Sequence, residues 1–482
     1  MSHKLSKVAL INPPVPDGIV WIREGRCQQW DIWGAPFPPF SLAMISTQLE
    51  REGVQTTIID SGPERKNASR VIEQCKKEDI DIVILTTTSP TIETDLGWFA
   101  VELKLHLPNL LIIAIGIHVS SLPEEVFRRY KELDYAIMGE PELSCKDLVL
   151  AISEGKEING IKGVAFRTGV ESVKVNEERP FKDNIDEYGF PNWNKINFSN
   201  YPLPIKKRPF SLISFSRGCP YTCKFCATHT YNGSILRKRS INALIEEIHF
   251  NLSLGVKDFL CWTELMTFDR RYLNSFLDSL MNEGMHKKIE WVCNSRVDGS
   301  DLTLFKKMKA AGCWQVAFGY EFGDERILQL ADKGGKATVE QGRIAAEAAH
   351  QAGLIVDGHF IMGYPGETKE SLQATIDYAC SLKLTFAHFY ACVPIPGSRL
   401  YKESVDQSWF NGSDWAKLNQ DKASISTPQL CPEMVQAYIR KAYKRFYIRP
   451  CIMMRGLKIP KSLNEYMNFA KLGIGFYKDL TS

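Results

Sequence analysis

Residues 211–231 read SLISFSRGCPYTCKFCATHTY, and this stretch decides how the rest of the chain is interpreted. Cys219, Cys223 and Cys226 follow a short β-branched and aromatic run with C-x3-C-x2-C spacing. Thiolates are good ligands for iron, and cubane iron–sulfur clusters normally take four of them. Three thiolates on one loop therefore predict a cluster whose fourth iron is open to a ligand. Gly218 and Pro220 would turn the loop back after a strand.

The loop resembles the signature of the radical S-adenosylmethionine (radical SAM) superfamily. In that family the open iron of a [4Fe–4S] cluster binds S-adenosylmethionine, and one electron releases a 5′-deoxyadenosyl radical. The resemblance implies that Cys219, Cys223 and Cys226 are metal ligands and that Phe225 lies near the adenine. The alternatives are buried free cysteines or a zinc site. Zinc sites usually contain paired C-x2-C units, and only one pair is present, although His229 follows three residues after Cys226.

The composition is that of a soluble globular protein. The chain has 482 residues, 44% of them hydrophobic and 24% charged, which is enough for two or three domains. The net charge of +3 is too small to argue for a nucleic-acid partner. No apolar run reaches the roughly 18 residues that a membrane span needs, and residues 1–14 resemble a first strand rather than a signal peptide. The 13 cysteines favour a reducing cytoplasm over a disulfide framework.

Short apolar runs alternate with amphipathic stretches from residue 1 to about residue 155. This pattern predicts a doubly wound parallel sheet, a Rossmann-like α/β domain. The predicted strands are 8–12, 56–60, 82–86, 111–115 and 135–138, and the predicted helices are 42–52, 68–78, 94–105 and 123–133. Ligands of such sheets bind beyond the carboxyl ends of the strands.

Small and polar residues follow those strands, where they would let a bulky planar ligand approach the backbone. No G-x-G-x-x-G follows the first strand, which argues against an ordinary dinucleotide site. The set resembles the cobalamin (B12)-binding domain that precedes the radical domain in one subgroup of the superfamily. The resemblance implies a cobalamin site made of Asn12, Pro13, Pro14, Thr87, Thr88, Ser89, Gly116, His118, Gly139 and Glu140.

The sequence lacks the D-x-H-x-x-G motif of the cobalamin mutases and methionine synthase, so that motif supplies no axial histidine. His118 could be considered as a cobalt ligand, but a loop histidine at a sheet edge is more often a hydrogen-bond donor or a packing residue. A flavodoxin-like domain with an unrelated role is the alternative interpretation. The long loop 21–39, rich in Trp, Arg and Pro, is a further candidate for ligand contact.

Residues 156–205 read as a hairpin followed by a proline-punctuated linker, and alternation resumes over residues 206–400. Strands at 211–216, 258–263, 289–295, 314–321, 356–363 and 387–394, with helices between them, predict a partial (β/α)6 barrel. By resemblance, the S-adenosylmethionine contacts are Phe225, Glu264, Arg296, Glu321, Gly363, Tyr364 and Pro365. The alternative for Arg296 and Glu321 is that they pair with each other across the barrel.

Residues 401–482 are predicted to form a helical C-terminal segment. Within it, residues 432–449 place apolar side chains on one face and five basic side chains on the others. Such a helix either packs its apolar face on the barrel, which is the commoner case, or contacts an anionic membrane as a peripheral protein. Four cysteines near the barrel strands, Cys261, Cys293, Cys313 and Cys392, are expected to be buried and unreactive.

The two resemblances together imply a cobalamin-dependent radical SAM enzyme with three cofactors: a [4Fe–4S] cluster, S-adenosylmethionine and cobalamin. The main prediction is methylation of an unactivated carbon in a small-molecule, lipid or tetrapyrrole substrate, driven by an external electron donor such as flavodoxin or ferredoxin. The first alternative is a radical oxidative cyclase resembling the anaerobic Mg-protoporphyrin IX monomethyl ester cyclase. The second is a non-catalytic corrinoid-binding or sensing protein, which would need no open iron. The sequence identifies no catalytic side chain.

Overall fold

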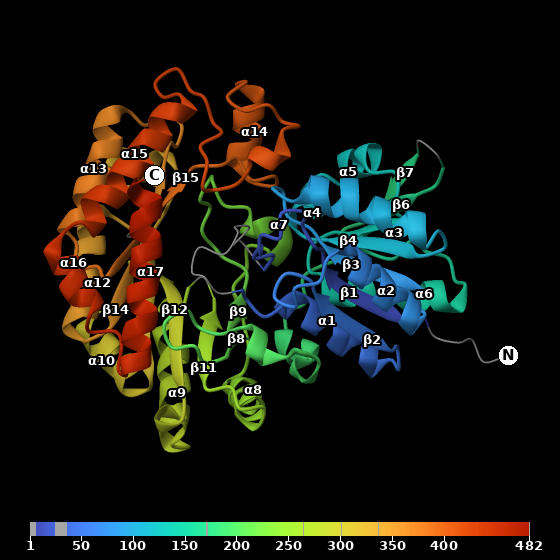
Figure 1. Cartoon of the computed structure of the whole chain (residues 1–482), viewed down its shortest axis with the longest axis horizontal. Helices are drawn as coiled ribbons and strands as arrows, with labels where there is room; N and C mark the ends of the chain where they lie inside the picture. Colours follow the sequence, from blue (N-terminus) through green and yellow to red (C-terminus); the bar gives the residue numbers. More distant parts are fainter. Residues whose placement is uncertain are drawn as a thin grey trace.

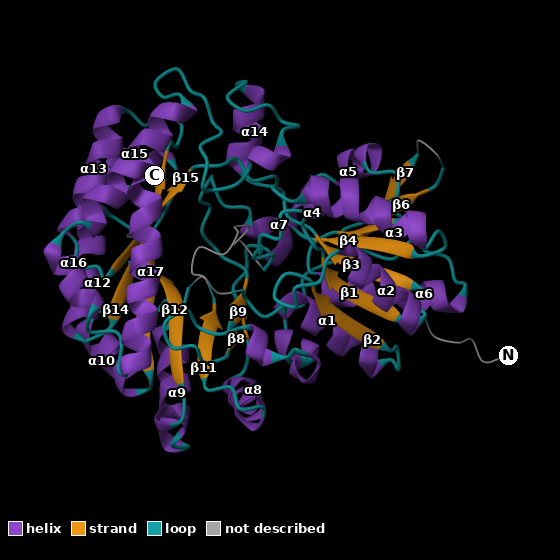
Figure 2. Cartoon of the chain, viewed as in Figure 1, coloured by secondary structure: helices purple, strands orange, loops and turns teal. Residues whose placement is uncertain are grey.

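The computed structural model describes residues 6–24, 36–169, 172–263, 265–299, 301–335 and 337–481, with side chains to residue 475. Two α/β units lie side by side, and the C-terminal helices pack on the outside of the second unit (Figure 1). Strands and helices alternate in both units (Figure 2), as the sequence predicts.

The first sheet has the order β2-β1-β3-β4-β5-β6-β7, and its first five strands are parallel. Four strands occupy the predicted residues, so the predicted doubly wound sheet is confirmed. The strands are β1 (Val8–Asn12), β2 (Thr56–Asp60), β3 (Ile82–Thr86), β4 (Leu111–Ile115), β5 (Tyr135–Ile137), β6 (Val164–Arg167) and β7 (Val173–Val175).

Helices cover both faces of this sheet, because its strands are apolar on both sides. Leu42 and Leu148 belong to the core on one face, and Val71, Leu103 and Phe127 belong to the core on the other. The helices are α1 (Phe40–Arg51), α2 (Ala68–Glu78), α3 (Ala100–His106), α4 (Ile117–Ser121), α5 (Pro123–Arg129) and α6 (Pro141–Glu154).

Two details of this unit differ from the expectation. The hairpin of β6 and β7 is not part of a linker, because β6 pairs antiparallel with β5 and extends the sheet. The stretch predicted as one helix over residues 94–105 begins as a π-helix, η1 (Glu93–Phe99), directly after the Thr-rich loop. π-helical turns are rare and occur frequently at functional sites.

The second sheet has the order β15-β14-β13-β12-β11-β8, and every strand is parallel to its neighbours. Its helices fill the connections, which confirms the predicted six-stranded partial barrel. The strands are β8 (Phe210–Ser214), β11 (Asp258–Trp262), β12 (Glu290–Arg296), β13 (Cys313–Glu321), β14 (Ile355–Met362) and β15 (Phe386–Ala391). The helices are α8 (Ile241–Ser253), α9 (Arg270–Asn282), α10 (Leu302–Ala310), α11 (Glu325–Leu330), α12 (Val339–Gln351) and α13 (Lys369–Ser381).

The helix α15 (Pro432–Tyr447) covers the edge strand β15. Tyr443 and Tyr447 accept hydrogen bonds from the backbone N–H groups of Phe389 and Ala387, so donors that an edge strand would expose are satisfied. The apolar side of α15 is buried, which confirms that this helix packs on the barrel. The other C-terminal helices are α14 (Arg399–Asp406), α16 (Pro450–Gly456) and α17 (Leu463–Thr481). No helix among the described residues is long and apolar enough to cross a membrane.

The carboxyl ends of both sheets point toward the middle of the molecule, where α7 (Thr228–Asn232) packs against α4 (Figure 1). A two-stranded ribbon of β9 (Ser216–Arg217) and β10 (Arg237–Lys238) lies there too. Short 3-10 turns complete the chain at Ile185–Tyr188, Trp193–Lys195, Phe198–Asn200, Met285–Lys287 and Trp415–Lys417. Each unit therefore presents the carboxyl ends of its strands to the other.

Candidate functional site

The β9–β10 ribbon closes the base of the loop that carries the three cysteines. Arg217 pairs with Arg237, so the loop leaves and returns at one point. Gly218, the first loop residue, has φ +84°, and a Cβ there would lie 2.1 Å from the carbonyl oxygen of Ile235. Only glycine tolerates both the positive φ and this contact, so Gly218 fixes the direction in which the loop enters.

Cys219, Cys223 and Cys226 are all half-buried on this loop, and none of them forms a disulfide. The backbone N–H of Cys226 donates to the carbonyl of Cys223 at 3.1 Å, and that of Cys219 donates to the carbonyl of Gly233 at 3.2 Å. Burial raises the pKa of the Cys223 thiol to about 11, against the opposing charge of Lys333. A thiol in such a place ionises when it binds a metal, whose charge stabilises the thiolate.

The zinc alternative finds no support in the loop. Nε2 of His229 lies 2.8 Å from the carbonyl oxygen of Cys219, so this ring hydrogen-bonds to the backbone of the loop. No group of three His, Cys, Asp or Glu side chains in the described part of the chain is arranged to hold a single metal ion. A cubane places its three thiolates on three different irons, farther apart than the ligands of one ion, and so fits the three cysteines.

Arg296 and Cys223 converge on one segment of backbone. The Arg296 guanidinium donates to the carbonyls of Lys333 (3.0 Å) and Gly334 (2.7 Å), and Cys223 donates to the carbonyl of Lys333 at 3.7 Å. The Lys333 ammonium in turn lies 2.5 Å from the Glu321 carboxylate. Arg296 pairs with Asp298 at 2.8 Å, so it does not pair directly with Glu321.

Glu321 is also unusual in its backbone. It has φ +64° and lies at an irregularity in the pairing of β13 with β14. A non-glycine residue in the left-handed region at a strand end is strained, and such strain concentrates at functional sites. The carboxylate of Glu321 and the guanidinium of Arg296 lie at the carboxyl ends of β13 and β12. That placement agrees with their predicted roles toward S-adenosylmethionine.

Phe225 and the turn at residues 363–368 belong to one apolar cluster beside the cysteines. The Phe225 ring contacts Phe322 edge-on at 6.4 Å, and Phe322 contacts Tyr364 at 5.6 Å. Glu367, fully buried, accepts the backbone N–H groups of Gly363 (2.7 Å) and Tyr364 (2.9 Å) and so holds the turn. Pro365 is buried in the same turn, whereas Glu264 lies outside the described residues.

The residues predicted to bind cobalamin surround the carboxyl ends of β1, β3 and β4. Asn12 donates to Asp60 at 3.1 Å and accepts from Thr86 at 2.5 Å, and Pro13 and Pro14 are buried directly after it. The Thr87 hydroxyl donates to the carbonyl of Ile115 at 2.9 Å. Because β1 lies between β2 and β3, the chain changes direction at this point of the sheet. Ligands of open α/β sheets bind at such a switch point.

The Thr-rich loop continues this polar ring. Thr88 and Thr91 share a hydrogen bond of 2.7 Å, and Thr91 donates to the buried Asp95 at 2.6 Å. Gly116 follows β4 with φ +129°, and a Cβ there would lie 2.3 Å from the Thr87 carbonyl oxygen. Glycine is therefore required where the β3 and β4 loops meet.

His118 is fully buried in this region. Its Nδ1 lies 3.0 Å from the hydroxyl of Ser89, and its ring packs edge-on against Trp415 at 4.4 Å. Nε2 has no hydrogen-bond partner among the described residues, and burial lowers the pKa of the ring to about 3. The contacts with Ser89 and Trp415 agree with the hydrogen-bonding or packing role expected of this histidine.

Glu140 lies at the contact between the two units. Its carboxylate receives hydrogen bonds from Arg237 (2.7 Å) and from the Tyr188 hydroxyl (2.9 Å), and Arg217 lies 3.4 Å away. Arg217 also pairs with Glu142 at 2.6 Å. Burial alone would raise the pKa of Glu140, but the two arginines hold it below its usual value. The adjoining Gly139 has φ +72°, so the chain turns here.

The donor sets fit the three cofactors. Three thiols on one loop suit the cluster, and a carboxylate and a guanidinium beside them suit the ammonium and carboxylate of S-adenosylmethionine. Hydroxyl and amide groups at the switch point suit the amide-rich edge of a corrinoid.

Sequence reasoning missed Arg217, Arg237 and Lys333. The glycine pair that follows Lys333 was the one local signal for it, because both glycines have positive φ.

The buried cysteines behave as expected. Cys261, Cys293 and Cys313 are each about 1–2% exposed on the outer faces of their strands, and Cys392 is 3% exposed. Burial raises the pKa of Cys261 and Cys392 well above the usual value. These four side chains are buried among apolar residues of the cores, so they serve packing.

Comparison with known proteins identifies both units. The family model of the radical SAM superfamily matches residues 213–379, and that of the B12 binding domain matches residues 33–149. The uncharacterized methyltransferase PH0819 of Pyrococcus horikoshii is 30% identical over 457 residues, covering 94% of this chain and 95% of that protein. The anaerobic magnesium-protoporphyrin IX monomethyl ester cyclase of Cereibacter sphaeroides is 26% identical, covering 91% and 72%.

Solved structures share the whole fold. The radical S-adenosylmethionine methyltransferase TsrM from Kitasatospora setae superposes with a TM-score of 0.72 at 16% identity, covering all of both chains. The cobalamin-dependent radical enzyme OxsB superposes with a TM-score of 0.71 at 15% identity, covering 99% of this chain and 72% of that one. Because the resemblance spans both units and the predicted cluster loop, the chain is an enzyme of the radical SAM superfamily, in the branch that carries a B12-binding domain and uses a [4Fe–4S] cluster, S-adenosylmethionine and cobalamin.

Proposed function

We propose that this enzyme transfers a methyl group through cobalamin to an unactivated carbon of a small-molecule substrate. When bound, the cluster with S-adenosylmethionine supplies a radical that removes a substrate hydrogen, and cobalamin supplies the methyl group. The chain's own residues hold these groups, orient them and keep water out.

One observation carries this proposal: the ion pairs that join Glu140 and Glu142 to Arg217 and Arg237. The two glutamates follow β5 of the B12-binding unit, and the two arginines frame the cysteine loop. All four side chains are at least nine-tenths buried. The network therefore holds the carboxyl end of one sheet against the cluster loop of the other, as methyl transfer between two cofactor sites requires.

The test is an anaerobic incubation of the reconstituted enzyme with cobalamin, reductant and S-adenosylmethionine that carries a deuterated methyl group. Mass spectrometry of the cobalamin and of 5′-deoxyadenosine reads the result. Labelled methylcobalamin together with 5′-deoxyadenosine supports the proposal. Absence of both products under conditions that load the cluster fully would overturn it.

A second candidate is oxidative cyclisation, which the similarity to the Cereibacter sphaeroides cyclase over 91% of this chain favours. In that case 5′-deoxyadenosine forms and the cobalamin stays unlabelled. Four aromatic residues in or beside the barrel strands do not decide between the two. Trp262, Phe386 and Tyr390 are half-buried on the inner face of the barrel sheet, whereas Trp314 packs under the Lys206 ammonium at 4.1 Å.

The electron comes, in this proposal, from a small external donor such as flavodoxin or ferredoxin. A reducing cytoplasm suits both the donor and the cluster, and no disulfide joins any of the described cysteines.

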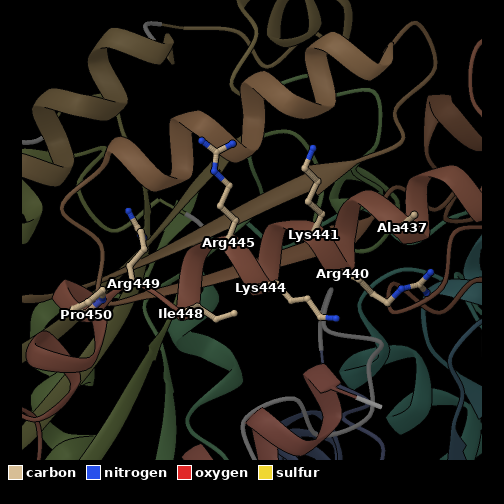
Figure 3. Close-up of a pocket in the computed structure, with 8 residues that line it drawn as sticks. All are labelled: Ala437, Arg440, Lys441, Lys444, Arg445, Ile448, Arg449 and Pro450. Carbon is tan, nitrogen blue, oxygen red and sulfur yellow. The ribbon is translucent and has the colours of Figure 1, made fainter.

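Peripheral membrane contact is proposed for the C-terminal helices. Figure 3 shows Arg440 and Lys444 projecting from one side of α15. The neighbouring helix α16 exposes Met453 (56%) and Met454 (60%), and Leu457 (53%) follows it directly. Basic side chains next to exposed apolar ones match an anionic lipid surface.

Vesicle co-sedimentation tests this contact. We expect binding to phosphatidylglycerol vesicles, loss of binding when Met453 and Met454 are both changed to Ser, and no loss for Leu105→Ser, an exposed leucine (70%) on α3. Equal binding to phosphatidylcholine vesicles, or none to either, would contradict it.

A further inference from the structure

The strands of the barrel sheet turn alternate side chains toward its inner face. Phe215 and Trp291 pack edge-on against Phe276 of α9, with ring centroids 4.7 and 6.2 Å apart, so they belong to the outer face. Because successive side chains of a strand point to opposite faces, Ser214 and Asn294 point inward. The proposed function gives these inner residues no role.

The register of the parallel strands arranges the inner residues in rows. The row nearest the carboxyl ends contains Arg296, a predicted S-adenosylmethionine contact, beside Gly319. The next row lies two residues, about 7 Å, further into the barrel. It consists of Ser214, Trp262, Asn294, Ala317 and Asp357. The row below that one is apolar and contains Leu212, Leu260 and Val292. The middle row is therefore the first polar surface beyond the predicted place of S-adenosylmethionine.

The part of the inner face that β14 and β15 form is already engaged. Asp357 lies 3.3 Å from Nε2 of His388, and Nδ1 of His359 lies 2.9 Å from the Tyr390 hydroxyl. These polar side chains satisfy one another, so they leave little for a ligand to bind.

Neutral hydrogen-bonding groups lie on the part that β8, β11 and β12 form. Trp262 and Asn294 are half-buried, and neither the indole N–H nor the carboxamide forms a hydrogen bond with any described residue. The hydroxyl of Ser214, which pairs with Trp262 in the register, likewise has no partner among the described residues. Buried polar groups are normally hydrogen-bonded, so these three are suited to a ligand.

Small residues on β13 leave space beside the Asn294 carboxamide. Ala317 is its neighbour in the register, and Gly319 follows on the same face. A Cβ at Gly319 would lie 2.5 Å from Oε1 of Glu321, so this position requires the smallest residue. On the other side of Asn294, the Trp262 ring meets the ring of Phe37 edge-on at 6.0 Å. The carboxamide therefore lies between an aromatic wall and an open floor.

We propose that Asn294 and Trp262 bind a neutral amide group of the substrate, a carboxamide or a lactam, in which a C=O acceptor lies next to an N–H donor. The Asn294 carboxamide would donate to the carbonyl and accept the N–H, and the Trp262 indole would donate to the same carbonyl. The inference rests on the proposed function, because it assumes that substrate occupies the inner face of the barrel. It deepens that function by naming the class of substrate.

A neutral ligand group suits this row better than a charged one. The charges in the row above are balanced, because Lys333 pairs with Glu321 and Arg296 pairs with Asp298. A charged group placed among neutral donors would lose its hydration without gaining a counter-charge, which is costly. An amide exchanges its hydrogen bonds with water for equivalent ones with the protein.

The adenine of S-adenosylmethionine is the competing occupant, because an asparagine side chain can also pair with an adenine edge. Phe225 and Tyr364, the predicted neighbours of the adenine, lie elsewhere. They gather around Phe322 at the ends of β13 and β14, with ring centroids 6.4 and 5.6 Å from it. This arrangement favours the substrate as the ligand of Asn294.

The test uses the holoenzyme with its cluster oxidised, hydroxocobalamin bound and its tryptophans replaced by 5-fluorotryptophan. The ¹⁹F resonance of Trp262, assigned by its loss in Trp262→Phe, is followed during titration with 2-pyrrolidinone, a lactam, and with N-methyl-2-pyrrolidinone, which lacks the N–H donor. We expect both probes to shift the resonance saturably, the lactam at a roughly tenfold lower concentration because it forms one more hydrogen bond. Saturating S-adenosylmethionine should leave this preference in place.

Variants assign the preference to Asn294. Asn294→Leu removes the donor and the acceptor at similar volume and should bring the two probes to equal affinity. Asn282→Leu, at an exposed asparagine that ends α9, is the matched control and should keep the preference. Ala317→Val fills the floor and should weaken both probes alike. The iron content of each variant shows whether it has folded.

Four results would overturn the proposal: no saturable shift, equal affinities of the two probes in the unsubstituted enzyme, a preference that survives in Asn294→Leu, or unchanged affinities in Ala317→Val. Loss of the shift when S-adenosylmethionine is bound would assign Asn294 to the adenine and overturn it as well. Label transfer to cobalamin in the unsubstituted enzyme reports separately on the proposed function.

Discussion

Arg237 donates two hydrogen bonds to the carboxylate of Glu140, at 2.7 and 3.2 Å, across 97 residues of sequence. Both side chains are about 5% exposed or less. Glu140 belongs to the B12-binding unit, and Arg237 belongs to the ribbon under the cysteine loop. This pair therefore links the B12-binding unit directly to the base of the cysteine loop.

Replacing Glu140 by Gln should lower the free energy of unfolding by about 3 kcal/mol, because it leaves Arg217 and Arg237 buried with reduced compensation. Urea denaturation of the purified chain measures this. Glu157→Gln, at an exposed position, is the control and should change stability by less than about 0.5 kcal/mol. Similar values for the two variants would show that the network does not hold the units together.

Gly218→Ala should destabilise the chain more than Gly255→Ala. Both glycines have positive φ, +84° and +81°, so both substitutions share a conformational cost of about 1 kcal/mol. A Cβ at Gly255 meets nothing within 4 Å, whereas one at Gly218 meets the Ile235 carbonyl at 2.1 Å, which adds about 2 kcal/mol. Urea denaturation and iron content measure the difference. Full iron loading of Gly218→Ala at wild-type stability would refute this account of the loop.

Cys223→Ala should abolish both cluster assembly and cleavage of S-adenosylmethionine, since two thiolates cannot hold a cubane with an open iron. Iron analysis should fall from about four irons per chain to near zero. Cys431→Ala, an exposed cysteine at the start of α15, should retain the iron. An unchanged iron content in Cys223→Ala would contradict the assignment of these cysteines as cluster ligands.

Glu367 should make stability depend on pH. Burial raises its pKa to about 8, above the usual 4.5 of a glutamate, so the folded chain holds a proton that the unfolded chain releases between these values. The contribution of Glu367 is therefore full below pH 4.5 and is lost as pH rises toward 8, by up to about 1.4 kcal/mol per pH unit. Glu367→Gln should flatten this slope in urea unfolding measured from pH 5 to pH 8. An unchanged slope would show that Glu367 is ionised, held by the N–H groups of Gly363 and Tyr364.

The strands could be predicted because each is a short run that is apolar on both faces. This pattern is typical of a parallel sheet that is covered by helices on both sides. The cysteine motif could be predicted equally well, because its three residues lie close together in the sequence. The hairpin of β6 and β7 was predicted, but its position beside β5 was not. The antiparallel pairing with β5 depends on tertiary contacts rather than on the local sequence pattern. The π-helical start after the Thr-rich loop has no sequence signal of its own.

The rest of the site could not be predicted because it consists of pairings between distant residues. Nothing near Arg237 indicates Glu140, and nothing near Asp357 indicates His388 on the next strand. Alternation along β14 and β15 places such residues on one face, but only the register between the strands brings them into contact. Sequence patterns therefore gave the elements, and the contacts between elements defined the site.

We expect the two units to hold cobalamin and the cluster face to face. The most direct measurement is electron paramagnetic resonance of the frozen holoenzyme in which cob(II)alamin and the reduced cluster are both present. We expect a magnetic interaction that broadens or splits both signals and weakens in Glu140→Gln. Two independent signals, each identical to that of its cofactor alone, would contradict it.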